Sequence, residues 1–125
     1  MHDKSMEHDS KPPVDVEGFR AAMREVGIEE IVDPTLDLFV KEAAKIFDAL
    51  KSALVAGDLE AVRAHSHSLK SSSGNIRALG LSEVLATLEE AAHSGDTSSV
   101  AQIFERVRPE YAAVMAHLLP SSEQG

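Results

Sequence analysis

The sequence predicts an all-α fold, an antiparallel four-helix bundle with a short additional helix on its N-terminal side. Apolar residues recur at alternating steps of three and four along four successive segments, and short loops join these segments. No stretch alternates polar and apolar residues as a half-buried strand would. Glycines also stand where the helical patterns end, the position at which a left-handed cap favours glycine: Gly27, Gly57, Gly80 and Gly95.

The first two predicted helices begin at residues suited to a helix N-terminus. Asp15 can accept hydrogen bonds from the backbone N–H groups of a short first helix, whose apolar face is Val16, Phe19, Met23 and Val26. Asp33 followed by Pro34 predicts the start of the second helix, because proline is tolerated in a first turn. The apolar stripe of this second helix is Leu36, Val40, Ala43, Phe47, Leu50 and Leu54.

The last three predicted helices continue the same rhythm. Asp58 opens the third helix, whose stripe is Leu59, Val62, Ser66, Leu69, Ser73 and Ile76. The fourth helix carries Leu81, Leu85, Leu88 and Ala92. Asp96 precedes the fifth, whose stripe is Val100, Phe104, Val107, Tyr111, Val114 and Leu118. Pro109 lies within this last helix and should kink or split it, because proline lacks a backbone N–H.

The composition is that of a soluble globular protein. Its 125 residues suffice for one hydrophobic core, and we expect one domain over residues 14–119 between flexible tails at 1–13 and 120–125. The net charge of −9 argues against nucleic acids or anionic membranes as partners. No apolar run reaches the roughly 18–20 residues that cross a bilayer, and the first residues lack a secretory signal. We therefore expect a cytoplasmic protein.

The third predicted helix carries His67 on the face opposite its apolar stripe. At 3.6 residues per turn, His67 points roughly 140° away from the centre of the stripe, so its imidazole should be exposed. Its neighbours on that face are small or cationic: Arg63, Ala64, Lys70, Ser71, Gly74 and Ala78. The cations recur every seven residues and predict a basic stripe made of Arg63, Lys70 and Arg77.

An exposed imidazole in this setting suits phosphoryl transfer. Neutral imidazole is a good nucleophile near neutral pH, and a neighbouring cation such as Lys70 can stabilise a phosphoryl group in transit. Small side chains leave room for the active site of another protein. Gly74 fits this interpretation, because glycine within a helix costs about 1 kcal/mol relative to alanine. Close approach by a partner would justify that cost.

The residues around His67 resemble the histidine-containing phosphotransfer (HPt) family. His67-Ser68-Leu69-Lys70-Ser71-Ser72-Ser73 is similar to the family signature, His-x-Leu-Lys followed by a small residue and then Ser-Ser or Ser-Ala. The resemblance extends over about residues 61–92, through Asn75-Ile76, Ala78-Leu79, Leu81 and Leu88-Glu89. It implies that His67 is phosphorylated at Nε2. The phosphoryl group would be exchanged with the aspartate of a response-regulator receiver domain, which supplies Mg²⁺, and hybrid sensor histidine kinases are further expected partners.

Two positions depart from the family pattern. The small residue after Lys70 is most often glycine in the family, and here it is Ser71. A later glycine, near the end of the third helix, is replaced by Arg77. We predict that His67 and Lys70 act in the transfer itself. The residues predicted to contact the partner are Arg63, Ala64, Ser71, Gly74, Arg77 and Ala78.

The other titratable residues have simpler interpretations. His65 lies at the edge of the apolar stripe, and His93 and His117 lie near helix C-termini, where the helix dipole favours them. We interpret Glu89 and Glu90 as solubilising surface residues. Histidines two residues apart on a helix diverge, and no Glu-x-x-His pairs occur on facing helices, so we predict no metal site.

The predicted function is that of a monomeric phosphoryl carrier without a cofactor of its own, either free-standing or part of a hybrid kinase. No glycine-rich nucleotide loop or kinase signature is present, so we expect no ATP-dependent kinase activity. One alternative is a helical adaptor that docks a receiver domain or a partner helix without accepting phosphate. A purely structural bundle is a third hypothesis. Labelling of a nitrogen by a phosphorylated receiver would distinguish the carrier from both.

Overall fold

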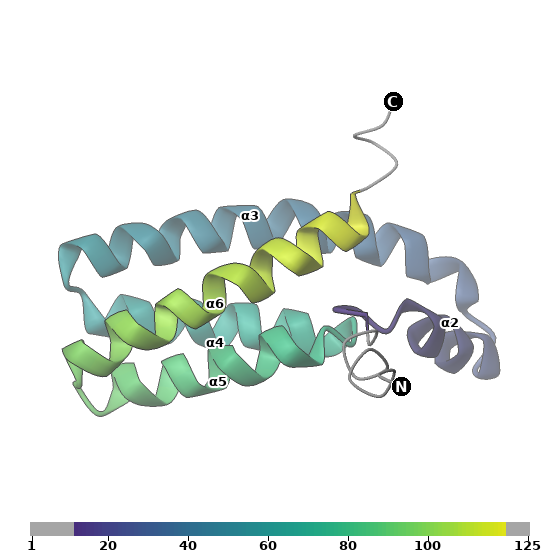
Figure 1. Cartoon of the computed structure of the whole chain (residues 1–125). Helices are drawn as coiled ribbons and strands as arrows, with labels where there is room; N and C mark the ends of the chain where they lie inside the picture. The colour runs from purple at the N-terminus through teal and green to yellow at the C-terminus, as the bar shows by residue number, and fades with distance from the viewer. Residues whose placement is uncertain (1–11, 120–125) are drawn as a thin grey trace, which may run out of the picture.

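The computed structural model describes residues 12–119, which form the predicted helical bundle (Figure 1). In chain order the elements are α2 (Val16–Glu25), the short 3-10 helix η1 (Glu29–Ile31), α3 (Val32–Ala56), α4 (Leu59–Asn75), α5 (Leu79–His93) and α6 (Thr97–Leu118). No strand occurs in these residues, and none of their helices is long and apolar enough to span a membrane. The all-α prediction is confirmed. Residues 1–11 of the predicted tail at 1–13, and the predicted tail at 120–125, lie outside the described residues.

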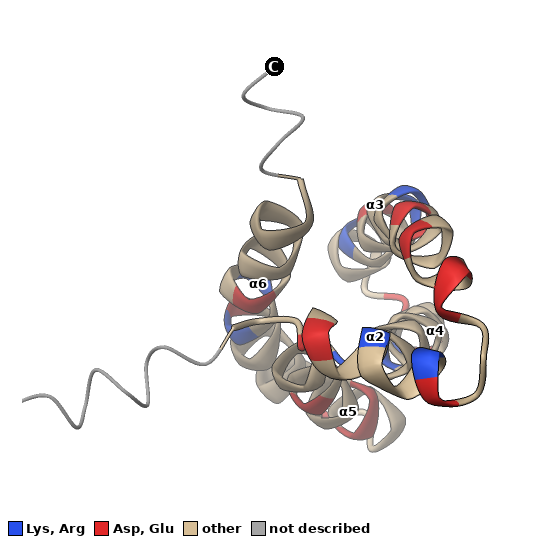
Figure 2. Cartoon of the chain, turned by 90° about the vertical axis from the view of Figure 1, so that its right-hand side faces the viewer, with Lys and Arg blue, Asp and Glu red and all other residues tan. Residues whose placement is uncertain are grey.

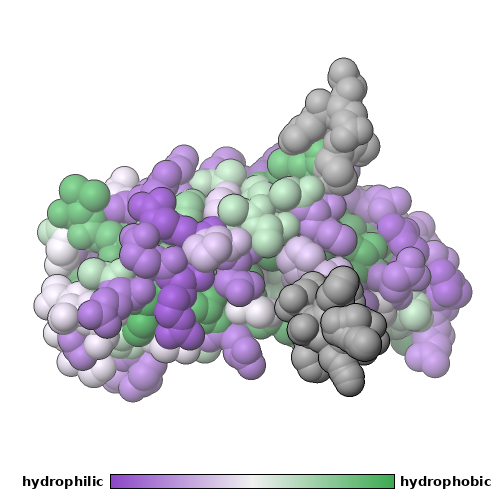
Figure 3. Space-filling model, viewed as in Figure 1, coloured by the Kyte–Doolittle hydropathy of each residue, from purple (hydrophilic) through white to green (hydrophobic). Residues whose placement is uncertain are grey.

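The four long helices surround a single interior, and α2 lies at one end of the bundle (Figure 2). Five leucines at predicted stripe positions are completely buried: Leu50, Leu69, Leu81, Leu85 and Leu88. Burying one such side chain contributes about 1.5–3 kcal/mol, so the stripes supply most of the force that joins the helices. On the face drawn in Figure 3 the apolar side chains are scattered among hydrophilic ones.

Aspartate side chains cap three of the helices, as predicted. The carboxylates of Asp15, Asp58 and Asp96 accept hydrogen bonds from backbone N–H groups in the first turns of α2, α4 and α6, with N–O distances of 2.9, 3.1 and 3.1 Å. Each cap satisfies a donor that has no partner within the helix and typically adds about 1 kcal/mol. Left-handed glycines follow α2, α3 and α5, also as predicted: Gly27, Gly57 and Gly95.

Two predicted helix boundaries are wrong. Gly80 lies within α5 and has no positive φ; the residue with a left-handed backbone at that junction is Arg77, with φ 69°. Asp33 does not cap α3, because η1 continues directly into α3 at Val32. The Asp33 carboxylate instead accepts a hydrogen bond from the Arg20 guanidinium of α2 at 2.9 Å. A contact between helices has replaced the expected local one.

Arg77 also attaches α2 to the end of α4. The carbonyl oxygen of Arg77 accepts a hydrogen bond from the backbone N–H of Asp15 at 3.1 Å, and its Nε lies 3.5 Å from Asp15 Oδ2. Gly18 lies beneath this pair, since an added Cβ there would collide with the Asp15 carboxylate and come within 3.0 Å of Arg77 Nε. A Cβ at position 18 would therefore force the Asp15 carboxylate away from its present position beside Arg77.

Pro109 does not split α6, which runs without interruption from Thr97 to Leu118. Proline removes the hydrogen bond that its N–H would have donated to the carbonyl of Glu105. Both residues are exposed, so water can bind that carbonyl. Of the two outcomes expected at Pro109, a split of the helix is therefore wrong.

We expect Ser66→Ala to stabilise the fold by about 1–2 kcal/mol. Ser66 is completely buried and its hydroxyl has no hydrogen-bond partner, so the substitution removes an unpaired polar group and improves helix propensity. Urea unfolding measures the change. Ser68→Ala is the matched control, because Ser68 is exposed on the same helix and should change stability through propensity alone. Destabilisation by Ser66→Ala would contradict the absence of a partner.

Candidate functional site

His67 lies near the middle of α4, on the side turned away from the core. The rotation of α4 about its axis is fixed by four side chains that are buried against the neighbouring helices: Val62, Ser66, Leu69 and Ser73. The opposite side of α4 therefore faces solvent, and 58% of the His67 side chain is exposed. The predicted exposure of the imidazole is confirmed.

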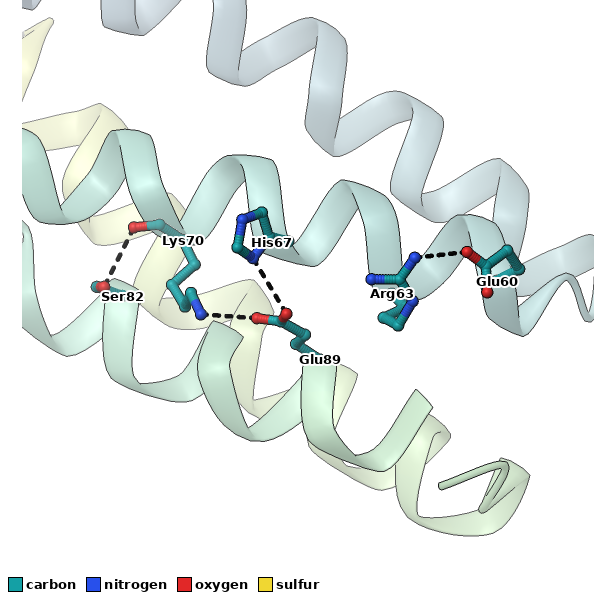
Figure 4. A network of polar contacts seen from close by, with 6 residues as sticks. All are labelled: Glu60, Arg63, His67, Lys70, Ser82 and Glu89. Atoms are coloured by element: carbon teal, nitrogen blue, oxygen red, sulfur yellow. Dashed lines mark hydrogen bonds and ion pairs between the residues drawn. The ribbon is translucent and has the colours of Figure 1, made fainter. Parts of the chain in front are cut away.

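Glu89 of α5 connects the two residues predicted to act in transfer. Its Oε2 lies 3.1 Å from His67 Nδ1, and its Oε1 lies 2.8 Å from Lys70 Nζ (Figure 4). Only 21% of the Glu89 side chain is exposed, so the carboxylate is partly shielded from water between α4 and α5. Histidine, carboxylate and ammonium thus form one network at the surface.

The charge of Glu89 determines which nitrogen of His67 carries a proton. The hydrogen bond from the Lys70 ammonium lowers the pKa of the Glu89 carboxyl below its usual value, and the hydrogen bond with His67 adds to that effect. An ionised carboxylate only accepts hydrogen bonds, so the facing Nδ1 must donate one. In the neutral ring the lone pair is then on Nε2. The network therefore leaves Nε2 as the ring nitrogen that can act as a nucleophile.

The turn of α4 that carries Lys70 is itself attached to α5. The hydroxyl of Ser82 donates a hydrogen bond to the backbone carbonyl of Lys70 at 3.2 Å (Figure 4). Leu85 and Leu88 of α5 are completely buried, which places Glu89 on the flank of α5 that faces α4. The relative positions of the three network residues therefore follow from the packing of the two helices.

Small residues border His67 on α4. Ala64 and Ser71 are exposed one turn to either side of it, and Gly74 is half-buried in the following turn. An added Cβ at Gly74 would meet only the Ser82 hydroxyl, at an ordinary contact distance of 3.5 Å. The fold therefore does not require glycine at this position. Access for a partner remains the interpretation that accounts for it.

A hollow of about 420 Å³ lies between α4 and α5 beside this network, lined by Arg63, Lys70, Ala86, Glu89, Glu90 and His93. His93, in the last turn of α5, belongs to this wall as well as to a helix C-terminus. Within residues 12–119 no three His, Asp or Glu side chains are arranged to hold a metal ion. The hollow adjoins two members of the network, Lys70 and Glu89.

One of the predicted partner contacts is buried, and a second lies beyond the end of α4. The Ala78 side chain is completely buried at the N-terminus of α5, so it cannot form part of an exposed surface. Arg77 lies beyond the end of α4, and its side chain is directed to Asp15. The seven-residue spacing fails there because α4 ends at Asn75. The basic stripe on α4 consists of Arg63 and Lys70 alone.

Glu89 is the residue of this network that is not identified from the sequence alone. From the sequence it is interpreted as a solubilising surface residue. A usable signal was nevertheless present: His67 and Glu89 lie equally far from Ala78, at the turn between their helices. Residues placed in this way on two antiparallel helices come to the same level of the pair.

The network should stabilise the fold in a pH-dependent manner. Because the folded state lowers the pKa of Glu89, its charge stabilises the protein above the usual glutamate pKa of 4.5. This contribution is lost as the pH falls through the lower pKa of the folded state. We expect Glu89→Gln to be less stable than the wild type at about pH 7 and this difference to be smaller at about pH 3. Denaturant unfolding at both pH values measures the difference, and a pH-independent difference would contradict it.

Comparisons with known proteins agree with this geometry. The sequence matches the Hpt domain family over residues 35–117, which extends from α3 almost to the end of α6. The structure resembles the crystal structure of histidine-containing phosphotransfer protein B (HptB) from Pseudomonas aeruginosa PAO1, with a TM-score of 0.78 and 30% sequence identity, covering 93% of this chain and 99% of that one. Curated protein sequences yield no match. The chain belongs to the Hpt domain family and is a phosphotransfer carrier of two-component phosphorelays.

Proposed function

We propose that His67 is the residue that carries the phosphoryl group, in exchange with the aspartate of a receiver domain. The observation that carries this proposal is the hydrogen bond between His67 Nδ1 and the Glu89 carboxylate. It leaves the Nε2 lone pair available on an imidazole that is open to solvent. A residue with these properties needs no separate base to act as a nucleophile.

The transfer step follows from this arrangement. The Nε2 lone pair attacks the phosphorus of the receiver's aspartyl phosphate, an N–P bond forms, and the P–O bond to the aspartate breaks. The aspartate leaves as a carboxylate, and the ring gains positive charge while Nδ1 keeps its proton. The Glu89 carboxylate stabilises this developing charge. In the reverse direction the same groups return the phosphoryl group to an aspartate.

Lys70 is proposed to stabilise the phosphoryl group during transfer. Its ammonium lies 2.8 Å from Glu89 Oε1, on the carboxylate that also binds His67, so it is held beside the imidazole (Figure 4). The side chain is 30% exposed, which leaves the ammonium accessible to a docked partner. An ammonium placed there can bind a phosphoryl oxygen while the carboxylate retains its bond to Nδ1.

The proposed partners are response-regulator receiver domains and a hybrid sensor histidine kinase, with Mg²⁺ contributed by the receiver. The exposed side chains Ala64 and Ser71, with Gly74, form the proposed docking edge beside His67. We also propose that the chain acts as a monomer in the cytoplasm. Light scattering during gel filtration tests that state.

A phosphotransfer profile tests the proposed function. The chain is incubated with each phosphorylated receiver of its source organism, and the modified residue is identified by mass spectrometry under conditions that preserve phosphohistidine. We expect rapid labelling of His67 by at least one receiver and no labelling by ATP alone. Receiver binding without labelling would instead support the adaptor hypothesis.

A further inference from the structure

Arg63 lies one turn before His67 on α4 but does not face it. Its guanidinium Nη2 forms an ion pair with Glu60 Oε2, one turn further towards the start of the helix, at 2.5 Å. Figure 4 shows the Arg63 side chain directed to Glu60 and away from the imidazole. The spacing between Arg63 and His67 nevertheless allows their side chains to meet, because residues four apart are neighbours on a helix surface.

Breaking the ion pair between Arg63 and Glu60 costs little free energy. The Glu60 side chain is 76% exposed and that of Arg63 is 34% exposed, so water can solvate the carboxylate once the guanidinium leaves. Exposed pairs of this spacing contribute little to stability. The two groups raise the pKa of Arg63 and lower that of Glu60 through their hydrogen bond, which agrees with a genuine but local contact.

Lys70 is bound more firmly than Arg63. Its counterion, Glu89, is only 21% exposed and also accepts the hydrogen bond from His67. Removing Lys70 would leave a partly shielded carboxylate without its cation, whereas removing Arg63 leaves a well-hydrated one. Of the two cations that flank His67 on α4, Arg63 is therefore the one free to move.

We propose that Arg63 binds the phosphoryl group once His67 is phosphorylated, a role that rests on the function proposed above. Glu60 holds the guanidinium while His67 is unmodified. Phosphorylation places up to two negative charges one turn from Arg63, with oxygens that a guanidinium can bind in a bidentate manner. The guanidinium then leaves Glu60 and binds the phosphoryl oxygens. Glu60 is thereby a positioning residue that competes with phosphohistidine for Arg63.

The direct test is a phosphorus NMR titration of the phosphorylated chain. Phosphoramidate, a small phosphoryl donor, is used to label His67 without a receiver. A bound guanidinium favours the fully ionised phosphoryl group. Arg63→Gln should therefore lower the acid dissociation constant of the phosphoryl group by about threefold. Glu60→Gln should strengthen that dissociation, and Arg63→Lys should retain part of the wild-type behaviour. Stability alone would not move this titration.

Two further comparisons isolate the proposed exchange. The double variant with Glu60→Gln and Arg63→Gln should titrate like Arg63→Gln, because the direct effect of Glu60 is screened at moderate salt. Arg108→Gln is the matched control, since Arg108 forms an exposed i,i+3 pair with Glu105 on α6. It should leave the phosphoryl titration unchanged.

The same exchange predicts how phosphate is distributed between the carrier and a receiver. At equilibrium, Glu60→Gln should shift the phosphoryl group towards His67 by about threefold, and Arg63→Gln should shift it towards the receiver. An unchanged phosphoryl titration in Arg63→Gln would overturn the proposal, and so would failure of phosphoramidate to label His67. If the variants change the phosphoryl titration as expected but no receiver labels the chain, the proposed exchange with a receiver is refuted. The role of Arg63 is then retained.

Discussion

Replacing His67 by Gln is expected to abolish labelling by a phosphorylated receiver. A glutamine amide has no basic nitrogen with an available lone pair, so it cannot replace Nε2 as a nucleophile. The fold should be retained, because the side chain is mostly exposed and substitutions at such positions change stability by about 0.5 kcal/mol or less. Transfer of radioactive phosphate from a receiver measures the effect, with thermal unfolding as the test of folding.

The other described histidines provide the controls. His65→Gln and His117→Gln should keep full labelling, because neither residue belongs to the network of Glu89. His93→Gln is the more demanding control, since His93 lines the hollow beside Lys70. If His67→Gln is still labelled and one of the control variants is not, the histidine replaced in that control is the phosphorylated residue.

A large side chain at Ser71 should prevent receiver docking without unfolding the carrier. Ser71 is exposed one turn after His67, so Ser71→Gln or Ser71→Leu extends into the space that a receiver must occupy. We expect KM for the phosphorylated receiver to rise by roughly tenfold or more, which corresponds to about 1.4 kcal/mol or more. Ser71→Gly should transfer well and lose roughly 0.5 kcal/mol of stability through its helix propensity.

The measurement must separate docking from chemistry. Labelling by phosphoramidate needs no protein partner and should proceed normally in Ser71→Gln, whereas receiver-dependent transfer should be slow. Ala113→Gln adds a side chain of the same size at an exposed position on α6 and should affect neither reaction. If Ser71→Gln accepts phosphate from the receiver at the wild-type rate, the docking surface does not include this edge of α4.

Features of this fold that depend on residues close together in the chain were predictable from the sequence. The apolar stripes define which side of each helix is buried, and they placed Leu69 inside and His67 outside without knowledge of any neighbouring helix. The caps at Asp15 and Asp58 were predictable for the same reason, since the donor and acceptor lie within one turn.

Contacts between helices explain the predictions that failed. Asp33 binds Arg20 of another helix, although its position before proline suggested a cap. The orientation of Glu89 towards His67 depends on how α5 rotates against α4, and periodicity within α5 does not contain that information. Arg77 shows a further limit, because the heptad spacing was extended past the residue at which α4 ends. Each failure concerns a partner distant in sequence or the termination of a helix.

The contact of Arg77 with Asp15 above Gly18 has an evolutionary consequence. A side chain at position 18 would occupy the space of this ion pair, so the present contact between Asp15 and Arg77 depends on the glycine. The left-handed backbone at position 77 also favours glycine over other residues. Relatives can therefore have glycine at this position and lack the ion pair. Among aligned relatives we expect these two sites to coevolve: larger residues at position 18 should accompany glycine, and not arginine, at position 77.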